Sequence, residues 1–529
     1  MKKIILIFII SLLPSSLLAQ DKQNPNVELP DFVITGKDVI SLQKAKKLDP
    51  GFISTISEEF IKPVFSPEEL GIKDISNPIQ NESGILNTEK VYSAKLNVVT
   101  GIYNSPSGNF TFTQPFGSGI FEAAINGENH RAYVENSDWY GANGGLNLSF
   151  FVPGDSKIRG TQFKIHGDYG LSSYKFFASN NPGERRNYYK GNISVDINNL
   201  VNRHFIFSLK AADEYSYLNK ENFTENLIKT DGFFKANFSY FKIGSNINYT
   251  KQILKNNLIG SGNFDYLSVR PYVETLILNS FKIAAGINYS NSGSSNYLSP
   301  YASAALKIND FISLYGELDP HAEFVGSGLL LSQNMYFNTQ NFANTFVKKT
   351  SDLDVSIKYE YFKYFEIDVG AKYFRATNLP YFVNSAQPGR FDVNFSSAKS
   401  YGGYINFLFH PGPAGMFYAS IDYNDTKDLN GNYIPYNPKL IGSAHYSYNF
   451  GSKLYAEPKI FFSSQSYADL NNTIKVDSFI NLGIKFLYKF VPNFSLSVEL
   501  SNLLDRKNYK WMGYKESPLD FFAGFTYKW

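Results

Sequence analysis

The chain has 529 residues, of which 50 are Lys or Arg and 47 are Asp or Glu, so its net charge is +3. This near-neutral balance argues against a nucleic-acid-binding protein, which needs a basic face. The 43% of hydrophobic residues excludes a chain that is disordered throughout, and the lack of Cys excludes disulfide scaffolds, thiolate zinc sites, iron–sulfur clusters and thiol nucleophiles. A chain of this length is either several soluble domains or one large closed sheet, and the 17% of aromatic residues favours the sheet.

Residues 1–19 are predicted to be a cleaved signal peptide. Lys2 and Lys3 give a cationic start, residues 4–18 form an apolar run broken by Pro14, and Ala19 supplies the small residue before cleavage. The apolar run is too short to anchor the chain as a membrane helix, and no later stretch approaches the roughly 18 apolar residues that such a helix needs. We therefore expect an exported protein that is either soluble or an outer-membrane β-barrel.

Strict alternation of apolar and polar residues decides between these two. In residues 352–361, Leu353, Val355 and Ile357 alternate with charged neighbours such as Asp354 and Lys358. The same period of two recurs in 92–102, 162–171, 365–373 and 494–500. A soluble sandwich also alternates, but these runs reach about ten residues with repeated charges on one face, as tilted membrane strands do, whereas soluble strands are usually nearer about five or six. The pattern predicts an all-β fold, a transmembrane antiparallel β-barrel.

Connections between these strands predict their number and orientation. Short turns are expected around 116–117, 153–154, 198–202, 241–242, 279–280, 308–310, 363–364, 410–413, 450–452 and 491–493, and longer polar loops at 172–187, 212–230, 319–350, 376–397, 424–436, 465–477 and 502–518. Alternation of short turns with long loops is typical of outer-membrane barrels, whose turns are periplasmic and whose loops are extracellular. Counting back from Trp529 gives about 22 strands within residues 87–529, an even number that fits two periplasmic termini.

The end of the chain resembles a known family. Four residues of the last strand share one face and end the chain on an aromatic, as in the barrel-assembly signal of outer-membrane proteins: Phe521, Phe525, Tyr527 and Trp529. The stretch 495–529, with Asn502-Leu503-Leu504-Asp505-Arg506 and the later Phe521-Phe522-Ala523-Gly524, resembles the last hairpin of TonB-dependent receptors, with one extra residue before the Tyr of the family pattern.

This resemblance covers residues 87–529 and implies the outer membrane of a Gram-negative (diderm) bacterium, contact with outer-membrane lipids and insertion by the barrel-assembly machinery. It also implies an uptake function.

The N-terminal part departs from that family. Residues 20–86 are too few for the family's globular plug and contain prolines throughout, so we expect a periplasmic or lumen-filling segment instead. Val27–Gly36 resembles the stretch near the front of the family's plug where energy coupling begins, although a simple extended tail is the alternative. Because barrels of this size are plugged in known transporters, we expect a stopper made from residues 20–86, from loops 319–350 and 376–397, or from a separate partner.

Catalytic and metal-binding patterns are not found in the sequence. The six His are scattered without metal-ligand spacing, and Gly141–Gly145 lacks the Lys of a phosphate loop. His166 shares a face with Asp168 and could form the His–Asp pair of a barrel hydrolase, but alternation in a pore wall explains these residues more simply. We expect a protein that is not an enzyme and holds no metal or cofactor.

Charged residues on the polar face are the candidate functional surface. By parity, those expected to face the lumen are Lys95, Lys164, Asp168, Asp352, Asp354, Lys358, Glu360, Glu366, Asp368, Lys372, Lys485 and Glu499. Their mixed signs predict little overall ion selectivity but a surface that can orient a polar solute, and simple solvation of a water-filled interior is the alternative.

Two functions follow from these features. The first is an outer-membrane barrel for passage or uptake of polar solutes, resembling TonB-dependent receptors and acting as a channel or with a periplasmic energy-coupling partner. The alternative is a non-transport scaffold in an outer-membrane assembly or secretion complex, whose loops and tail dock a lipoprotein. Neither reading involves nucleic acid.

Overall fold

The computed structural model describes residues 93–152, 160–199, 204–277, 280–293, 295–342, 345–361, 364–410, 415–451 and 453–529. The predicted signal peptide 1–19 and the predicted segment 20–86 lie outside the described residues. Within them, no helix is long and apolar enough to cross a membrane.

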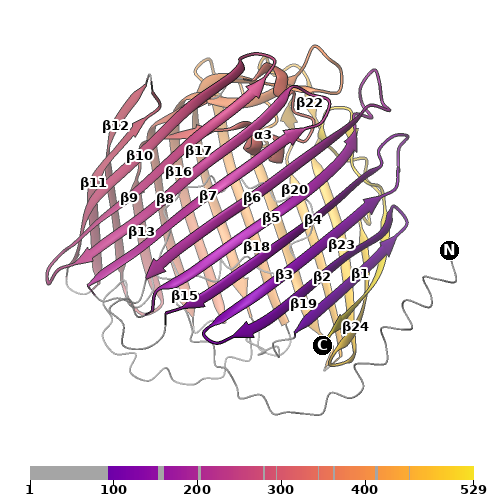
Figure 1. Ribbon diagram of the computed structural model, residues 1–529, viewed down its shortest axis with the longest axis horizontal. Helices are drawn as coiled ribbons and strands as arrows, with labels where there is room; N and C mark the ends of the chain where they lie inside the picture. Colours follow the sequence, from indigo (N-terminus) through magenta and orange to yellow (C-terminus); the bar gives the residue numbers. More distant parts are fainter. Residues whose placement is uncertain are drawn as a thin grey trace. The chain divides into compact units, whose positions relative to one another are not determined.

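One antiparallel sheet closes on itself through its first and last strands (Figure 1). β1 (Ala94–Gly101) pairs with β27 (Asp520–Lys528), with Val98 opposite Phe525. The backbone amides of Ala94 and Trp529 each donate to the other's carbonyl at 3.0 Å. This pairing satisfies the edges of the first and last strands, and such closure is why a sheet can span a membrane only as a barrel.

Two short strands together occupy the position of one strand in the wall of this barrel. β13 (Ile312–Leu318) and β14 (His321–Val325) pair with successive parts of β15 (Thr345–Tyr361), with Leu318 opposite Leu353 and His321 opposite Lys349. The interruption falls at Pro320, which has no backbone N–H to donate to the ladder. With this pair counted once, the barrel has 22 strands, as the sequence predicted.

The remaining strands follow in chain order around the wall. They are β2 (Asn104–Phe116), β3 (Gly119–His130), β4 (Trp139–Phe151), β5 (Gln162–Lys175), β6 (Arg185–Asn199), β7 (Phe205–Leu218), β8 (Phe223–Asn237), β9 (Lys242–Asn256), β10 (Gly260–Ile277), β11 (Phe281–Asn291), β12 (Asn296–Lys307), β16 (Phe365–Asn384), β17 (Phe391–Phe409), β18 (Gly415–Asp428), β19 (Leu440–Asn449), β20 (Leu454–Ser463), β23 (Phe479–Val491) and β24 (Phe494–Ser501). Two small hairpins stand apart in the loops: β21 (Ser466–Tyr467) with β22 (Lys475–Val476), and β25 (Tyr509–Trp511) with β26 (Tyr514–Lys515).

Short turns join the strands at one end of the barrel, as predicted, but several loops at the other end are shorter than expected. The predicted loop 212–230 is mostly strand, since β7 runs to Leu218 and β8 starts at Phe223, and most of 376–397 belongs to β16 and β17. Beyond the membrane neither face of a strand needs to be apolar, so the alternation fades while the backbone ladder continues. These loop predictions were wrong for that reason.

The two faces of the wall differ as the alternation requires. In β15, Leu353, Val355 and Ile357 are 40%, 48% and 45% exposed, whereas Ser356 and Lys358 between and beside them are buried. Large exposed aliphatic side chains on one face of a closed sheet are typical of a lipid-facing surface.

Candidate functional site at the extracellular mouth

A single connection, here called the roof segment (residues 326–342), crosses the loop end of the barrel. It joins β14 to β15 and contains α3 (Ser327–Gln333) and the 3-10 turn η2 (Thr339–Asn341). The segment contacts Arg186 on β6, and Phe337 forms an isolated bridge with Phe391 on β17. Because β6 and β17 stand on roughly opposite sides of the wall, a chain that touches both has to lie across the opening.

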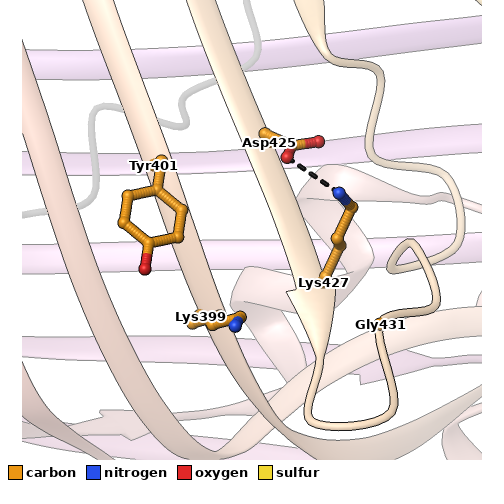
Figure 2. Close-up of a pocket in the computed structure, with 5 residues that line it drawn as sticks. All are labelled: Lys399, Tyr401, Asp425, Lys427 and Gly431. Carbon is orange, nitrogen blue, oxygen red and sulfur yellow. Dashed lines mark ion pairs between the residues drawn. The ribbon is translucent and has the colours of Figure 1, made fainter.

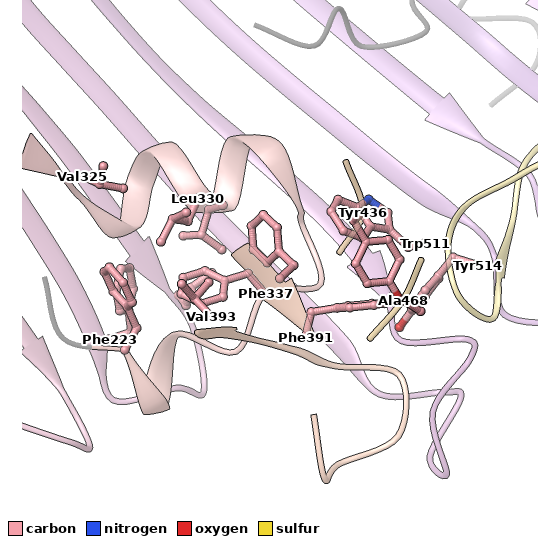
Figure 3. Close-up of a cluster of buried hydrophobic side chains, with 14 of the residues drawn as sticks. Phe223, Val325, Leu330, Phe337, Phe391, Val393, Tyr436, Ala468, Trp511 and Tyr514 are labelled. Carbon is pink, nitrogen blue, oxygen red and sulfur yellow. The ribbon is translucent and has the colours of Figure 1, made fainter. Parts of the chain in front are cut away.

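Aromatic and aliphatic side chains pack the roof segment against the surrounding loops and strand ends (Figure 3). Phe337 is 0% exposed and Phe391 1%. The buried cluster comprises Leu218, Phe223, Leu254, Val325, Leu330, Leu331, Phe337, Phe342, Val347, Ala376, Phe382, Phe391, Val393, Tyr436, Ala468, Val476, Trp511 and Tyr514. The largest buried apolar cluster of the described chain therefore lies at the mouth.

The β25–β26 hairpin supplies the far side of this cluster. Trp511 lies 5.2 Å from Phe391, centroid to centroid, and Tyr514 stacks on Tyr336 of the roof segment at 3.4 Å. The Tyr514 hydroxyl donates to the carbonyl of Gly389 at 2.6 Å. Burial raises the pKa of Tyr336 well above its usual value, so this phenol stays neutral within the packed layer.

Buried polar side chains of the wall hold the backbone of the roof segment. Arg186 donates to the carbonyls of Met335 and Phe337 at 2.9 and 2.8 Å. Glu225 accepts from the amides of Ser327 and Gly328 at 2.8 and 2.5 Å, at the start of α3. Asn256 of β9 reaches the other end and donates to the Phe342 carbonyl at 2.5 Å. Backbone groups that leave the strand ladder are thus satisfied by side chains of three strands, β6, β8 and β9.

A buried charge network ties the same region together. Glu221 accepts from Arg186 Nε at 2.8 Å, from Arg390 at 3.1 Å and from the Thr339 hydroxyl at 3.0 Å. Arg390 also pairs with Glu184 at 2.7 Å. The side chains of Arg186 and Glu221 are 1% and 7% exposed, so this pair is removed from water and depends on its full set of partners.

Several sequence-predicted lumen residues lie together on β15 and β16. Lys358 pairs with Glu366 at 2.6 Å and with Glu360 at 3.7 Å, and it stands opposite Asp368 in the strand register. Further along the same two strands, Lys372 of β16 lies 4.0 Å from Asp354 of β15.

Nearer the mouth, Asp352 pairs with Lys349 at 3.2 Å and lies 3.9 Å from His321. Together these residues form one ion-paired strip along two adjacent strands.

The other predicted lumen residues are distributed around the wall. Lys485 stands opposite Glu499, which pairs with Lys459 at 2.5 Å. Three more lie on distant strands: Lys164 opposite Asp196, Lys95 opposite Thr111, and Asp168 beside His166.

The His166–Asp168 contact is 2.7 Å, and the other ring nitrogen of His166 contacts Asn147 at 2.5 Å. Within the described residues, no cluster of His, Asp and Glu is arranged to hold a metal ion.

The structure contains a second charged cluster, which was not predicted from the sequence. Glu274 of β10 is 4% exposed and lies 3.2 to 3.4 Å from the ammonium groups of Lys235, Lys242 and Lys282, which come from β8, β9 and β11. The preceding residue, Val273, faces outward and is 49% exposed. Because successive residues of a strand point to opposite faces, the alternation along β10 would have predicted Glu274 on the inner face.

The residues of the predicted assembly signal lie on the outer surface of the closing strand. Phe521, Tyr527 and Trp529 are 41%, 37% and 43% exposed, and Phe525 stands opposite Leu496 of β24.

Comparison with known proteins relates this geometry to a class. No protein-family model matches the sequence, and no curated protein matches it. Among solved structures, it is similar to the ferripyoverdine receptor of the outer membrane of Pseudomonas aeruginosa bound to ferripyoverdine, at 12% identity and a TM-score of 0.62 over 83% of this chain and 72% of that one. The FrpB iron transporter from Neisseria meningitidis matches at 9% identity and a TM-score of 0.63, over 84% and 83% of the two chains. The copper transporter OprC matches at 11% identity and a TM-score of 0.61, over 83% and 80%.

These likenesses concern the fold. Together with the closed 22-strand sheet and its lipid-type outer face, they define an outer-membrane β-barrel of a Gram-negative bacterium. The barrel has the same fold as the receptor and the two transporters just described, and the roof segment crosses its extracellular mouth.

Proposed function

We propose that this barrel takes up a polar solute, in the manner of TonB-dependent receptors, and that the roof segment is its extracellular gate. The observation that carries the proposal is the crossing of the mouth by residues 326–342, anchored from β6, β8, β9 and β17. The comparison supports it, since the similar barrels are a ferripyoverdine receptor, an iron transporter and a copper transporter. The ion-paired inner wall around Lys358 and Asp354 is the surface that the solute would meet below the roof.

The other predicted segments would have the following roles in this proposal. Residues 1–19 would direct export, and residues 20–86 would complete the closure from the periplasmic side and bind an energy-coupling partner or a lipoprotein. The outward aromatics Phe521, Phe525, Tyr527 and Trp529 would be recognised by the barrel-assembly machinery. The barrel at residues 87–529 would act without enzyme chemistry.

Replacing the roof segment tests the gate directly. Val325 stands opposite Thr345 in the ladder, so a two-residue Asn-Gly turn can join β14 to β15 in place of residues 326–344 without disturbing the register. We expect the variant, reconstituted in planar bilayers, to conduct markedly more than the wild type. Deletion of residues 20–86 is the matched comparison, and the double deletion measures the fully open lumen.

Each result has a distinct meaning. If the roof replacement leaves the conductance unchanged in both the presence and the absence of residues 20–86, the roof segment is not the gate. If only deletion of residues 20–86 raises the conductance, that segment is the stopper.

A non-transport scaffold is the second candidate, favoured by the buried Arg186–Glu221 pair and the stacked Tyr336–Tyr514 rings, which anchor the roof as firmly as a permanent seal. For a scaffold, a partner should co-purify in constant proportion after gentle detergent extraction, and polar solutes should not enter liposomes that carry the wild-type barrel. Solute entry without a stable partner would support uptake instead.

A further inference from the structure

Three cations form a transverse row on the outer surface of the wall. In the strand register, Arg375 of β16 stands opposite Lys399 of β17, and Lys399 stands opposite Lys427 of β18. Lys399 alternates with buried Ala398 and Ser400 and shares its face with Tyr401, which is 54% exposed. Figure 2 shows Lys399 and Tyr401 on one strand beside Asp425 and Lys427 on the next. We call Arg375, Lys399 and Lys427 the cation row.

The cation row carries more positive charge than the carboxylates beside it in the described residues can neutralise. Like charges directly opposite each other on neighbouring strands destabilise a sheet. The one carboxylate beside the row, Asp425, pairs with Lys427 at 3.0 Å and with Lys439 of the following loop at 3.5 Å. No ion pair joins Arg375 or Lys399 to any carboxylate of the described residues. Two of the cations share Asp425, and no carboxylate of the described residues pairs with the other two, so an external anion would stabilise the row.

The row lies at the level of the outer lipid headgroups. Towards the periplasmic end from Lys399, the outward side chains Tyr401, Ile405 and Phe409 are 54%, 42% and 40% exposed. A tilted strand crosses the hydrocarbon with about 9–11 residues, and residues 401–409 supply that length. In the row below the cations, Tyr373 and Tyr401 lie 4.9 Å apart, as in the aromatic belt of a membrane interface.

A shallow groove of about 300 Å³ opens at this place. Lys399, Tyr401, Asp425, Lys427 and Gly431 line it. The ammonium groups of Lys427 and Lys439 lie 4.7 and 4.1 Å from the ring centroid of Tyr433, which fixes them on one side of the groove.

We propose that the cation row binds the phosphate group of a lipid headgroup in the outer leaflet. Neighbouring strands lie about 4.8 Å apart, so the row presents its charges over about 10 Å, which suits the several oxygens of a phosphate monoester. The guanidinium of Arg375 can donate two hydrogen bonds to one phosphate, and the two lysine ammonium groups can pair with its negative charge. The ring of Tyr401 can pack against the upper part of an acyl chain. This lipid site is on the outside of the wall and is independent of what passes through the lumen.

Titration with defined lipids tests the assignment. Native mass spectrometry of the purified full-length barrel in non-ionic detergent measures binding of phosphatidic acid, a phosphate monoester, against phosphatidylcholine and inorganic phosphate. We expect preferential binding of phosphatidic acid by the wild type and about 30-fold weaker binding by the double variant K399Q/K427Q, from the usual contribution of a lysine near an anionic surface.

The matched control is the double variant K251Q/K255Q. These two lysines lie on β9, on either side of exposed Ile253, but Lys251 faces Asp265 and Lys255 faces uncharged Ser261 and Thr224. The control variant removes the same two positive charges as K399Q/K427Q. The gel migration of unheated samples shows whether both variants fold. Equal losses in the two double variants, or no loss in either, would overturn the site. Binding of inorganic phosphate as tightly as phosphatidic acid would overturn the lipid as its ligand.

Discussion

The roof and the wall of this barrel are stabilised in opposite ways. In the wall, large aliphatic side chains such as Val355 point away from the protein, and the inner face carries ion pairs such as Lys358–Glu366. In the roof, the aromatic side chains of Phe337 and Phe391 are enclosed by other protein groups, as in the core of a soluble domain. The wall therefore depends on lipid and the backbone ladder, whereas the roof depends on side-chain packing.

This difference implies that the two regions can be destabilised separately. A large-to-small change in the roof should loosen the mouth while the barrel stays closed, because the ladder from β1 to β27 does not involve the roof segment. A change on the lipid face should instead weaken insertion and leave the roof intact. The predictions below use this separation, from the largest expected effect to the smallest.

Truncation of Phe391 should have the largest effect. Phe391→Ala removes a fully buried ring that contacts Trp511, Tyr436 and Tyr514, and such a change typically lowers stability by about 3–5 kcal/mol. We expect higher bilayer conductance and faster proteolysis within residues 326–342, with unchanged heat-resistant migration of the barrel. Ile405→Ala, a truncation on the lipid face, is the control. A variant barrel that loses heat resistance as well would show that roof and wall are one cooperative unit.

Neutralising Glu221 should come next. Glu221→Gln leaves the enclosed guanidinium of Arg186 without its counter-charge, and breaking a buried pair of this kind lowers stability by about 3 kcal/mol or more. Hydrogen exchange of the amides in residues 327–342 should accelerate. Glu184→Gln, whose side chain is 42% exposed at the edge of the same network, should change this exchange far less. Equal acceleration by the two variants would mean that burial does not decide the strength of the network.

A charge on the lipid face tests the wall. Ile405→Lys places an ammonium in the middle of the outward band of β17, where it should lower the free energy of unfolding from lipid vesicles by about 2–3 kcal/mol. The neighbouring Asn406→Lys faces the interior and should be tolerated, losing only the bond from the Ser420 hydroxyl. Denaturant titration in vesicles compares the two. The assignment of the faces would be wrong if Asn406→Lys proved the more harmful change.

The wall could be predicted from the sequence because its physics is local. Alternation in stretches such as 352–361 records which side of a strand meets lipid, so the strand type, the strand number and the two faces follow from residue order alone. The same rule would have placed Glu274 on the inner face, but its three lysine partners come from other strands and depend on the register between them.

The roof could not be predicted in the same way. Phe337, Phe391 and Trp511 are far apart in the chain, and no periodicity marks residues that meet only after a loop folds across an opening. The sequence identified loop 319–350 as a candidate stopper from its length, without the anchors Arg186 and Asn256 on distant strands. Long-range contacts of single residues are the information that a local pattern does not carry.

The smallest expected effect concerns a loop outside both regions. Asp138, between β3 and β4, accepts from Lys175 Nζ at 2.6 Å and pairs with Arg185. Partial burial of this carboxyl opposes its ionisation, but the hydrogen bonds from Lys175 and Arg185 outweigh that effect and lower its pKa. A lowered folded-state pKa means that the pair stabilises the loop above the ordinary pKa of Asp, about 3.9, and that the stabilisation is lost as the pH falls through the folded-state value. Since the side chain is 31% exposed, we expect less than about 1 kcal/mol.

Asp138→Asn should therefore speed hydrogen exchange in residues 131–138 at pH 6, and the difference from the wild type should shrink as the pH falls and the wild-type carboxyl becomes protonated. After correction for the intrinsic effect of pH on exchange, the two proteins should converge in acid. Asp310→Asn, in a turn at the other end of the barrel, is the control and should leave this loop unchanged. A difference between Asp138→Asn and wild type that persisted undiminished at pH 2 would show that the loop is held by packing rather than by its charge pair, which would extend the roof type of stabilisation to this loop.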